Sequence, residues 1–222
     1  MKNYYISVNQ FAEFSSGTAA TKKRIIKQQV NPNKFLLPWY QTARSAMKKY
    51  FKDVNNSTPL DNAIEILASR KNDSKRKQID QRVSIEALNE LKAFAFPTLL
   101  RDVEFEIIKP DIKNIVVNNV NIIVAPDVVL KAVYDGNVIY GAIKIHICKS
   151  KPFDENQSKY VAGLILKYLN NTISKADGIV LPELCLCLDI FGGRITPASV
   201  YTSKLNSEIR TICEELKFLW AA

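Results

Sequence analysis

The chain has 222 residues, of which 47% are hydrophobic and 24% charged, the balance of an ordinary globular domain. No apolar run approaches the roughly 20 residues that a membrane-spanning helix needs. The segment Met1–Tyr5 lacks the apolar core of a signal peptide. We therefore expect one domain over residues 1–222, a cytoplasmic location and no membrane partner.

Positive charge is concentrated in the first half of the chain. The formal net charge is +9, and residues 1–109 hold 19 Lys and Arg against 11 Asp and Glu, whereas residues 110–222 hold 12 against 11. Such asymmetry favours a surface that faces a polyanion, with nucleic acid as the expected partner. A solvated basic face that only keeps the protein soluble is the alternative.

The first hundred residues read as a helical, basic region. Capping residues, prolines and helical spacing of apolar side chains predict the successive helices. A short helix follows Ser7, a basic one starts at Thr18 or Thr21, and further helices cover Pro38–Phe51, Leu60–Ser69 and Ser84–Leu91. Between the last two, the charge run Arg70–Lys77 is expected to be an exposed turn or helix end.

After Pro97 the pattern changes to strands. Alternating apolar and polar residues, or runs of β-branched residues, predict strands over 103–108, 115–117, 120–124, 128–130, 138–147 and 184–190. Asp135-Gly136 and Gly192-Gly193 are expected to close hairpins. Helices are predicted over 153–170 and 203–220. The fold class is thus α+β, with a helical region 1–100 and a mixed, mostly antiparallel sheet core 101–222 flanked by two helices.

The cysteines and the single histidine argue against a structural metal site. The four cysteines form no CxxC pair, and His146 is the only histidine. The cysteines are Cys148, Cys185, Cys187 and Cys213. We expect four free, buried thiols in a reducing compartment.

Asp127 and Lys144 are the most informative pair of residues. Asp127 follows Pro126 at the head of one apolar strand, and Lys144 lies in the next strand across the Asp135-Gly136 turn. A carboxylate and an ammonium on paired strands can meet over one face of a sheet. Hairpin, acid and lysine therefore predict a site for a divalent metal and a phosphate.

This arrangement resembles the PD-(D/E)XK nuclease superfamily, which has the restriction-endonuclease-like fold, over roughly residues 100–200. The RecB-like branch fits best, because Gln157 and Tyr160 lie on the helix after the Lys144 strand, and Ser7–Phe11 resembles the short first helix of that branch. The resemblance implies Mg²⁺ or Mn²⁺ bound by Asp127 and a catalytic Lys144 that orients the attacking water. An iron–sulfur cluster is not expected, since no cysteine precedes Cys148.

The sequence departs from the family pattern at one position. Two residues before Lys144, where the pattern has a second acid, stands Ala142. One carboxylate holds Mg²⁺ poorly, so a replacement acid would be needed. Glu106 and Glu86 are the acids that we assign as metal ligands with Asp127, and Glu104, Glu90 and Glu155 are further candidates.

Each candidate also has a plain structural explanation. His146 shares the face of Lys144 and could accept a proton, or it could be a satisfied structural residue. Lys144 could be an edge-strand lysine and Asp127 a turn-capping carboxylate. Gln157 and Tyr160 could be ordinary helix residues.

Three functions follow from these observations. The first is a metal-dependent nuclease acting on DNA or RNA, with a displaced second acid. The second is a catalytically inactive nucleic-acid-binding protein on the same fold, and the third is an assembly protein whose basic face meets an acidic protein. The nucleic-acid contacts are expected from two basic segments, with residues Lys22, Lys23, Arg24, Lys27, Lys75, Arg76 and Lys77.

Overall fold

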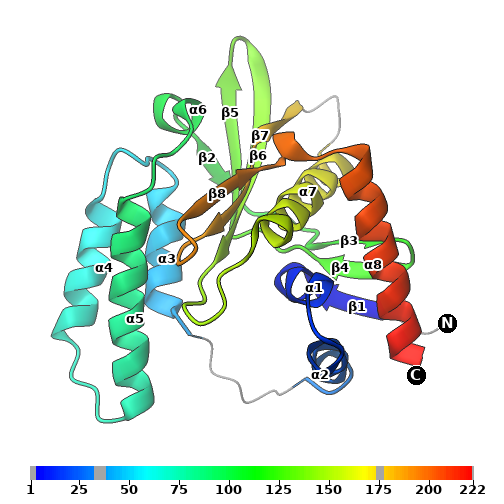
Figure 1. The fold of residues 1–222 in the computed structure, drawn as a ribbon. Coiled ribbons are helices and arrows are strands. Elements are labelled where there is room, and N and C mark those ends of the chain that lie inside the picture. Colours follow the sequence, from blue (N-terminus) through cyan, green and yellow to red (C-terminus); the bar gives the residue numbers. More distant parts are fainter. Residues whose placement is uncertain (1–3, 33–38, 174–177, 222) are drawn as a thin grey trace.

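The computed structural model describes residues 4–32, 39–173 and 178–221. The element order is β1 (Tyr4–Ser7), α1 (Val8–Ser15), α2 (Ala19–Val30), α3 (Gln41–Tyr50), α4 (Thr58–Ser69), α5 (Lys75–Lys92), α6 (Thr98–Asp102), β2 (Glu106–Ile108), β3 (Asn114–Val117), β4 (Val120–Ile123), β5 (Val128–Tyr134), β6 (Asn137–His146), α7 (Glu155–Thr172), β7 (Ile179–Asp189), β8 (Arg194–Pro197), a short 3₁₀ turn (Ala198–Val200) and α8 (Ser203–Ala221). The expected α+β class is confirmed: a mainly helical first half precedes mixed sheets flanked by α7 and α8 (Figure 1).

Two sheets organise the second half. The larger has the order β2-β5-β6-β7-β8, in which β6 and β7 run parallel and the other pairs are antiparallel. The parallel pair needs a crossover, and α7 supplies it. The smaller sheet has the order β1-β4-β3, with β1 parallel to β4.

Two apolar cores cover the two faces of the larger sheet. One contains Phe11 and Phe14 of α1 and Tyr168 of α7, and it includes the small sheet and α8. The other contains Met47 of α3 and Leu88 of α5 and also takes in α4. Side chains alternate between them along β6, which is the pattern of a sheet buried on both faces. Figure 1 shows helices α3, α4 and α5 on one side of these strands and helices α1 and α7 on the other side.

Local sequence signals account for many element boundaries. Ser7 caps α1 by accepting a hydrogen bond from the Gln10 N–H at 3.4 Å, and Thr18 does the same for α2 with Thr21 at 3.3 Å. Asp135 and Gly136 have φ of 48° and 75°, so this turn closes the β5–β6 hairpin as expected. At Gly141 a Cβ would lie 2.4 Å from the Cβ of Leu184, so glycine lets β6 and β7 approach at their register shift.

Other boundaries differ from the expected ones. The α5 helix begins at Lys75 rather than Ser84, because Ser74 accepts a hydrogen bond from the Lys77 N–H at 3.3 Å and caps it earlier. The strand expected over 103–108 is formed only at Glu106–Ile108, and β1 was not predicted. The expected helix start at Pro38 lies outside the described residues, and α3 is described from Gln41.

Candidate functional site

Asp127 lies in the connection between β4 of the small sheet and β5 of the large sheet, directly before β5. Its N–H donates to the Ile143 carbonyl at 2.8 Å, which fixes the residue beside β6. Its side chain is only 6% exposed. Two residues earlier, Ala125 has φ of 37°, in the left-handed region that favours glycine, and its carbonyl accepts a hydrogen bond from Lys144 Nζ at 2.7 Å. The hairpin thus brings Asp127 and Lys144 together, as the sequence predicted.

Three cations surround this one carboxylate. Arg44 Nη1 lies 2.8 Å from Asp127 Oδ1, Lys48 Nζ lies 3.5 Å from the same oxygen, and Lys144 Nζ lies 3.9 Å from Oδ2. The Ile145 N–H also donates to Oδ2 at 2.9 Å. Arg44 and Lys48 stand one turn apart on α3, so one face of that helix supplies both charges. The cluster holds three positive charges against one negative charge.

The pKa values in this cluster follow from burial and charge. Burial opposes ionisation of Asp127, but Lys144, Arg44 and the Ile145 N–H outweigh it, so its pKa lies below the usual value. Burial lowers the pKa of Lys144; Asp127 opposes this shift, whereas Arg44 and Lys48 add to it. Asp127 is therefore a stable anion at neutral pH, already matched by its neighbours.

An open groove of about 830 Å³ lies beside Asp127. The end of α3, the segment after β2 and the approach to β5 line it, through Lys48, Lys49, Lys109, Lys113, Ile107, Ile108, Pro110, Pro126 and other residues. Asp127 is the one acid among the described residues that line the groove. Lys49, Lys109 and Lys113 are exposed and make no ion pair within the described part of the chain. Four lysines against one acid therefore give this largely apolar groove a net positive charge.

The acids assigned as further metal ligands do not join Asp127. Glu86 on α5 forms an ion pair with Lys149, and Glu106 stands opposite Lys131 in the β2–β5 ladder. In the described ranges no group of three or more His, Cys, Asp and Glu side chains could hold a metal ion. Ala142, two residues before Lys144 on β6, is fully buried in the apolar core.

The alternative acids offer no better ligand set. Glu155 forms an ion pair with Lys159 at 2.5 Å, and Glu104 lines separate pockets beside Lys52. Glu90 is an exposed residue of α5. The donor set around Asp127 thus does not fit Mg²⁺ or Mn²⁺: a hard dication needs uncommitted oxygen ligands, and here cations already take up the single carboxylate.

His146, Gln157 and Tyr160 make no hydrogen bond or ion pair with this carboxylate in the described part of the chain. His146 Nε2 donates to the Lys151 carbonyl at 2.9 Å, and its ring stacks on Phe153 with centroids 3.6 Å apart. Gln157 completes the capping box of α7 and donates to the Ala12 carbonyl and Ser16. Tyr160 donates to Glu208 at 3.0 Å. All three have structural partners.

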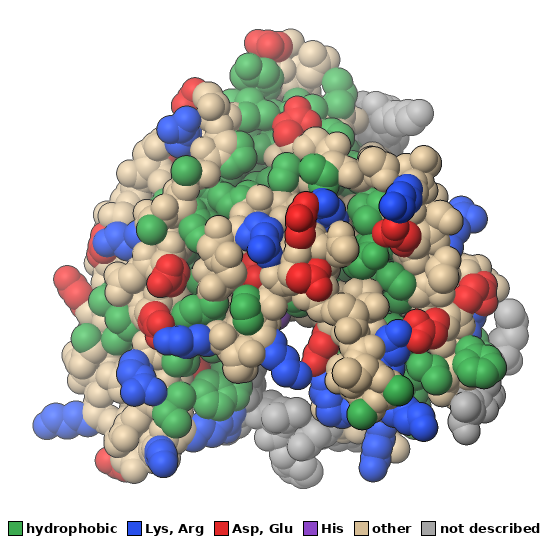
Figure 2. Space-filling model, in the orientation of Figure 1, with side chains coloured by type: hydrophobic (Ala, Val, Ile, Leu, Met, Phe, Trp, Pro, Cys, Tyr) green, Lys and Arg blue, Asp and Glu red, His purple; other side chains and the backbone are tan. Residues whose placement is uncertain are grey.

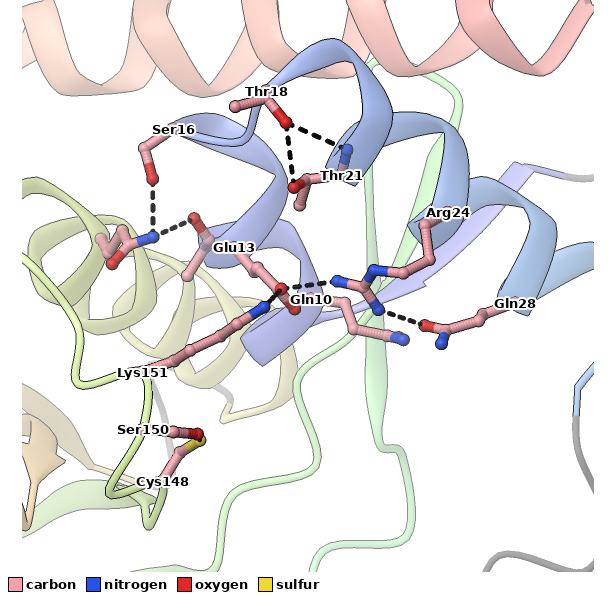
Figure 3. A network of polar contacts seen from close by, with 12 residues as sticks. Gln10, Glu13, Ser16, Thr18, Thr21, Arg24, Gln28, Cys148, Ser150 and Lys151 are labelled. Carbon is pink, nitrogen blue, oxygen red and sulfur yellow. Dashed lines mark hydrogen bonds and ion pairs between the residues drawn. The ribbon is translucent and has the colours of Figure 1, made fainter.

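A second cavity, of about 520 Å³, lies between α1 and the loop after β6. Figure 3 shows its polar border, where Glu13 accepts from both Arg24 at 2.6 Å and Lys151 at 3.0 Å. Below that pair, Cys148 lies 3.7 Å from Ser150. Among the residues that line this cavity, Glu13 and Lys151 offset one another, so it lacks the surplus of lysines found beside Asp127.

Some side chains of the two predicted basic segments form ion pairs, and others are exposed to solvent. Lys22 pairs with Glu215 at 2.6 Å and Arg24 with Glu13, whereas Lys23 and Lys27 are exposed on α2. Lys75, Arg76 and Lys77 form the first turn of α5, and the Arg76 guanidinium lies 5.2 Å from the Trp39 ring centroid. Figure 2 shows Lys and Arg gathered in the lower half of one face, on either side of a hollow.

Sequence reasoning missed Arg44, Lys48, Lys49, Lys109 and Lys113. Arg44 and Lys48 carry a weak signal, because they are four residues apart on a helix whose other face is apolar. Nothing in the sequence connects that helix with Asp127, which lies 83 positions later. Lys109 and Lys113 flank Pro110 in a segment that reads only as a loop.

Comparison of the sequence with protein-family models finds no match, and comparison with curated proteins finds none either. Among the described residues no helix is long and apolar enough to cross a membrane.

Proposed function

We propose that this chain binds the phosphate backbone of nucleic acid in the groove beside Asp127, on a PD-(D/E)XK-like core, without hydrolysing it. The observation that carries the proposal is the excess of charge: one carboxylate is matched by three cations, and Lys49, Lys109 and Lys113 extend the positive groove. When such side chains neutralise phosphates, the nucleic acid releases its condensed counterions. This release makes binding favourable and dependent on the salt concentration.

The topology supports the PD-(D/E)XK part of the proposal. Strands β2, β5 and β6 are antiparallel neighbours, although β3 and β4 of the small sheet come between β2 and β5 in the chain; α7 then crosses over, and β7 pairs parallel with β6. The resemblance implies an acid at the head of the middle strand and a lysine on the next, which agrees with Asp127 directly before β5 and Lys144 on β6, 3.9 Å apart. Ala142, and the lack of a second carboxylate beside Asp127 among the described residues, favour binding over hydrolysis.

The binding is tested by fluorescence anisotropy with labelled single-stranded and duplex DNA and RNA over a range of salt concentrations. The double variant Lys109→Glu/Lys113→Glu is expected to bind about tenfold more weakly and to lower the salt slope by roughly 0.9 for each lost duplex phosphate contact. Lys204→Glu, an exposed lysine of α8, is the matched control and should bind as the wild type does. Absence of binding at low salt would refute the proposal and favour an acidic protein partner.

The absence of hydrolysis is tested separately. The wild type is incubated with the same nucleic acids in Mg²⁺ and in Mn²⁺, and no cleavage is expected. Metal-dependent cleavage that disappears in Lys144→Ala would overturn this part of the proposal and support a nuclease whose second acid comes from elsewhere.

A further inference from the structure

The Arg44 guanidinium lies between two oxygens that a metal ion would otherwise use. Its Nη1 donates to Asp127 Oδ1 at 2.8 Å and to the Ile145 carbonyl oxygen at 3.1 Å. Carboxylate and main-chain carbonyl oxygens are the ligands that hard cations take in proteins. One nitrogen of a permanently charged side chain therefore bridges the two oxygens at this position.

The neighbouring groups reinforce this arrangement. Lys48 Nζ is 3.5 Å from the same Asp127 oxygen, and Lys144 Nζ is 3.9 Å from the other, so an added dication would face three positive charges. Burial makes that repulsion stronger than it is in water, since the Asp127 and Lys144 side chains are 6% and 15% exposed. The same surplus of positive charge attracts an anion.

We infer that Arg44 is a built-in replacement for a metal ion, so that this site takes phosphate groups without any divalent cation. The guanidinium compensates Asp127 and holds α3 against the ends of β5 and β6. With Asp127 held in this way, Lys49, Lys109 and Lys113, which make no ion pair among the described residues, are left to face the ligand. The metal-ion part of this inference stands by itself, and the phosphate part rests on the proposed function.

The first test measures Mn²⁺ binding in two ways. Electron paramagnetic resonance reports the free ion, and the Tm of the protein is compared in Mn²⁺ and in EDTA. The wild type should leave the Mn²⁺ signal and its own Tm unchanged. Stoichiometric Mn²⁺ binding by the wild type that is lost in Asp127→Asn would overturn the inference.

The second test reverses the charge at the proposed cation position. Arg44→Glu brings a second carboxylate toward Asp127 and the Ile145 carbonyl, and it should acquire a Tm that rises with Mn²⁺. Arg44→Gln, which keeps an amide donor but supplies no charge, is the matched control and should not respond. An Arg44→Glu protein whose folding and Tm are the same with and without Mn²⁺ would count against a cation position here.

The third test concerns the phosphate ligand. Nucleic-acid affinity of the wild type should be no higher in Mg²⁺ than in EDTA, because Mg²⁺ only competes for the phosphates. A requirement for Mg²⁺ would refute metal-independent phosphate binding. If the wild type binds no nucleic acid under either condition, the proposed function fails, while the two metal-ion measurements still decide the role of Arg44.

Discussion

Asp127 and Asp189 are both carboxylates at strand ends of the large sheet, yet their surroundings differ. Asp127 has three cationic neighbours and lines an open groove. Asp189 is fully buried at the end of β7; its Oδ2 accepts from the Phe153 N–H at 2.6 Å, and its Oδ1 has no hydrogen-bond partner among the described residues.

The pKa values of the two carboxyls move in opposite directions for this reason. Burial raises the pKa of Asp189, and the opposing influence of His146 and main-chain donors does not reverse that shift. At Asp127 the neighbouring cations do reverse it. Burial alone therefore does not define a candidate site; a surplus of charge that borders solvent does, because only that surplus attracts a charged ligand.

Replacing Asp127 should have the largest effect on stability. Asp127→Asn leaves three cations without their shared anion, and we expect the free energy of unfolding to fall by roughly 3 kcal/mol, as for a broken buried ion pair. Urea unfolding at neutral pH measures the change. Asp135→Asn, in the exposed β5–β6 turn, is the matched control, with an expected change within about 0.5 kcal/mol. Equal values for the two variants would show that the cation cluster does not stabilise the fold.

The Asp127 effect should also depend on pH. Because the folded pKa lies below the usual 3.8, the ionised carboxylate contributes stability that is fully present well above pH 3.8 and is lost as pH falls through the folded pKa. The unfolding free energies of the wild type and Asp127→Asn should converge in that acidic range. The measurement is a series of urea unfolding curves from pH 7 downward, and a constant difference throughout would contradict the assignment.

The corresponding change at Asp189 should have the smallest effect. Asp189→Asn keeps an oxygen for the Phe153 N–H and removes a charge that burial disfavours, so the unfolding free energy should change by less than about 1 kcal/mol. Asp189→Ala, which leaves that buried N–H unpaired, should be more destabilised than Asp189→Asn. If Asp189→Asn proves as damaging as Asp127→Asn, the contrast between the two carboxylates fails.

The sequence by itself determined the local framework of this protein. Neighbours in the chain, or the register of adjacent strands, decide several features that were predicted. These are the fold class, the caps at Ser7 and Thr18, the hairpin at Asp135-Gly136 and the approach of Asp127 to Lys144. The early start of α5 and the strand β1 were not predicted, because a second capping serine and a parallel partner far along the chain decided them.

Only the tertiary structure decided what surrounds Asp127. Packing of α3 on one face of the sheet brings Arg44 and Lys48 to a carboxylate more than 70 positions away. Glu86 instead pairs with Lys149, and the β2–β5 register sets Glu106 opposite Lys131, so neither acid is paired with Asp127's cations. Spacing along a chain predicts which side chains share a strand or helix face, whereas the sign of the charge in a pocket depends on which faces pack together.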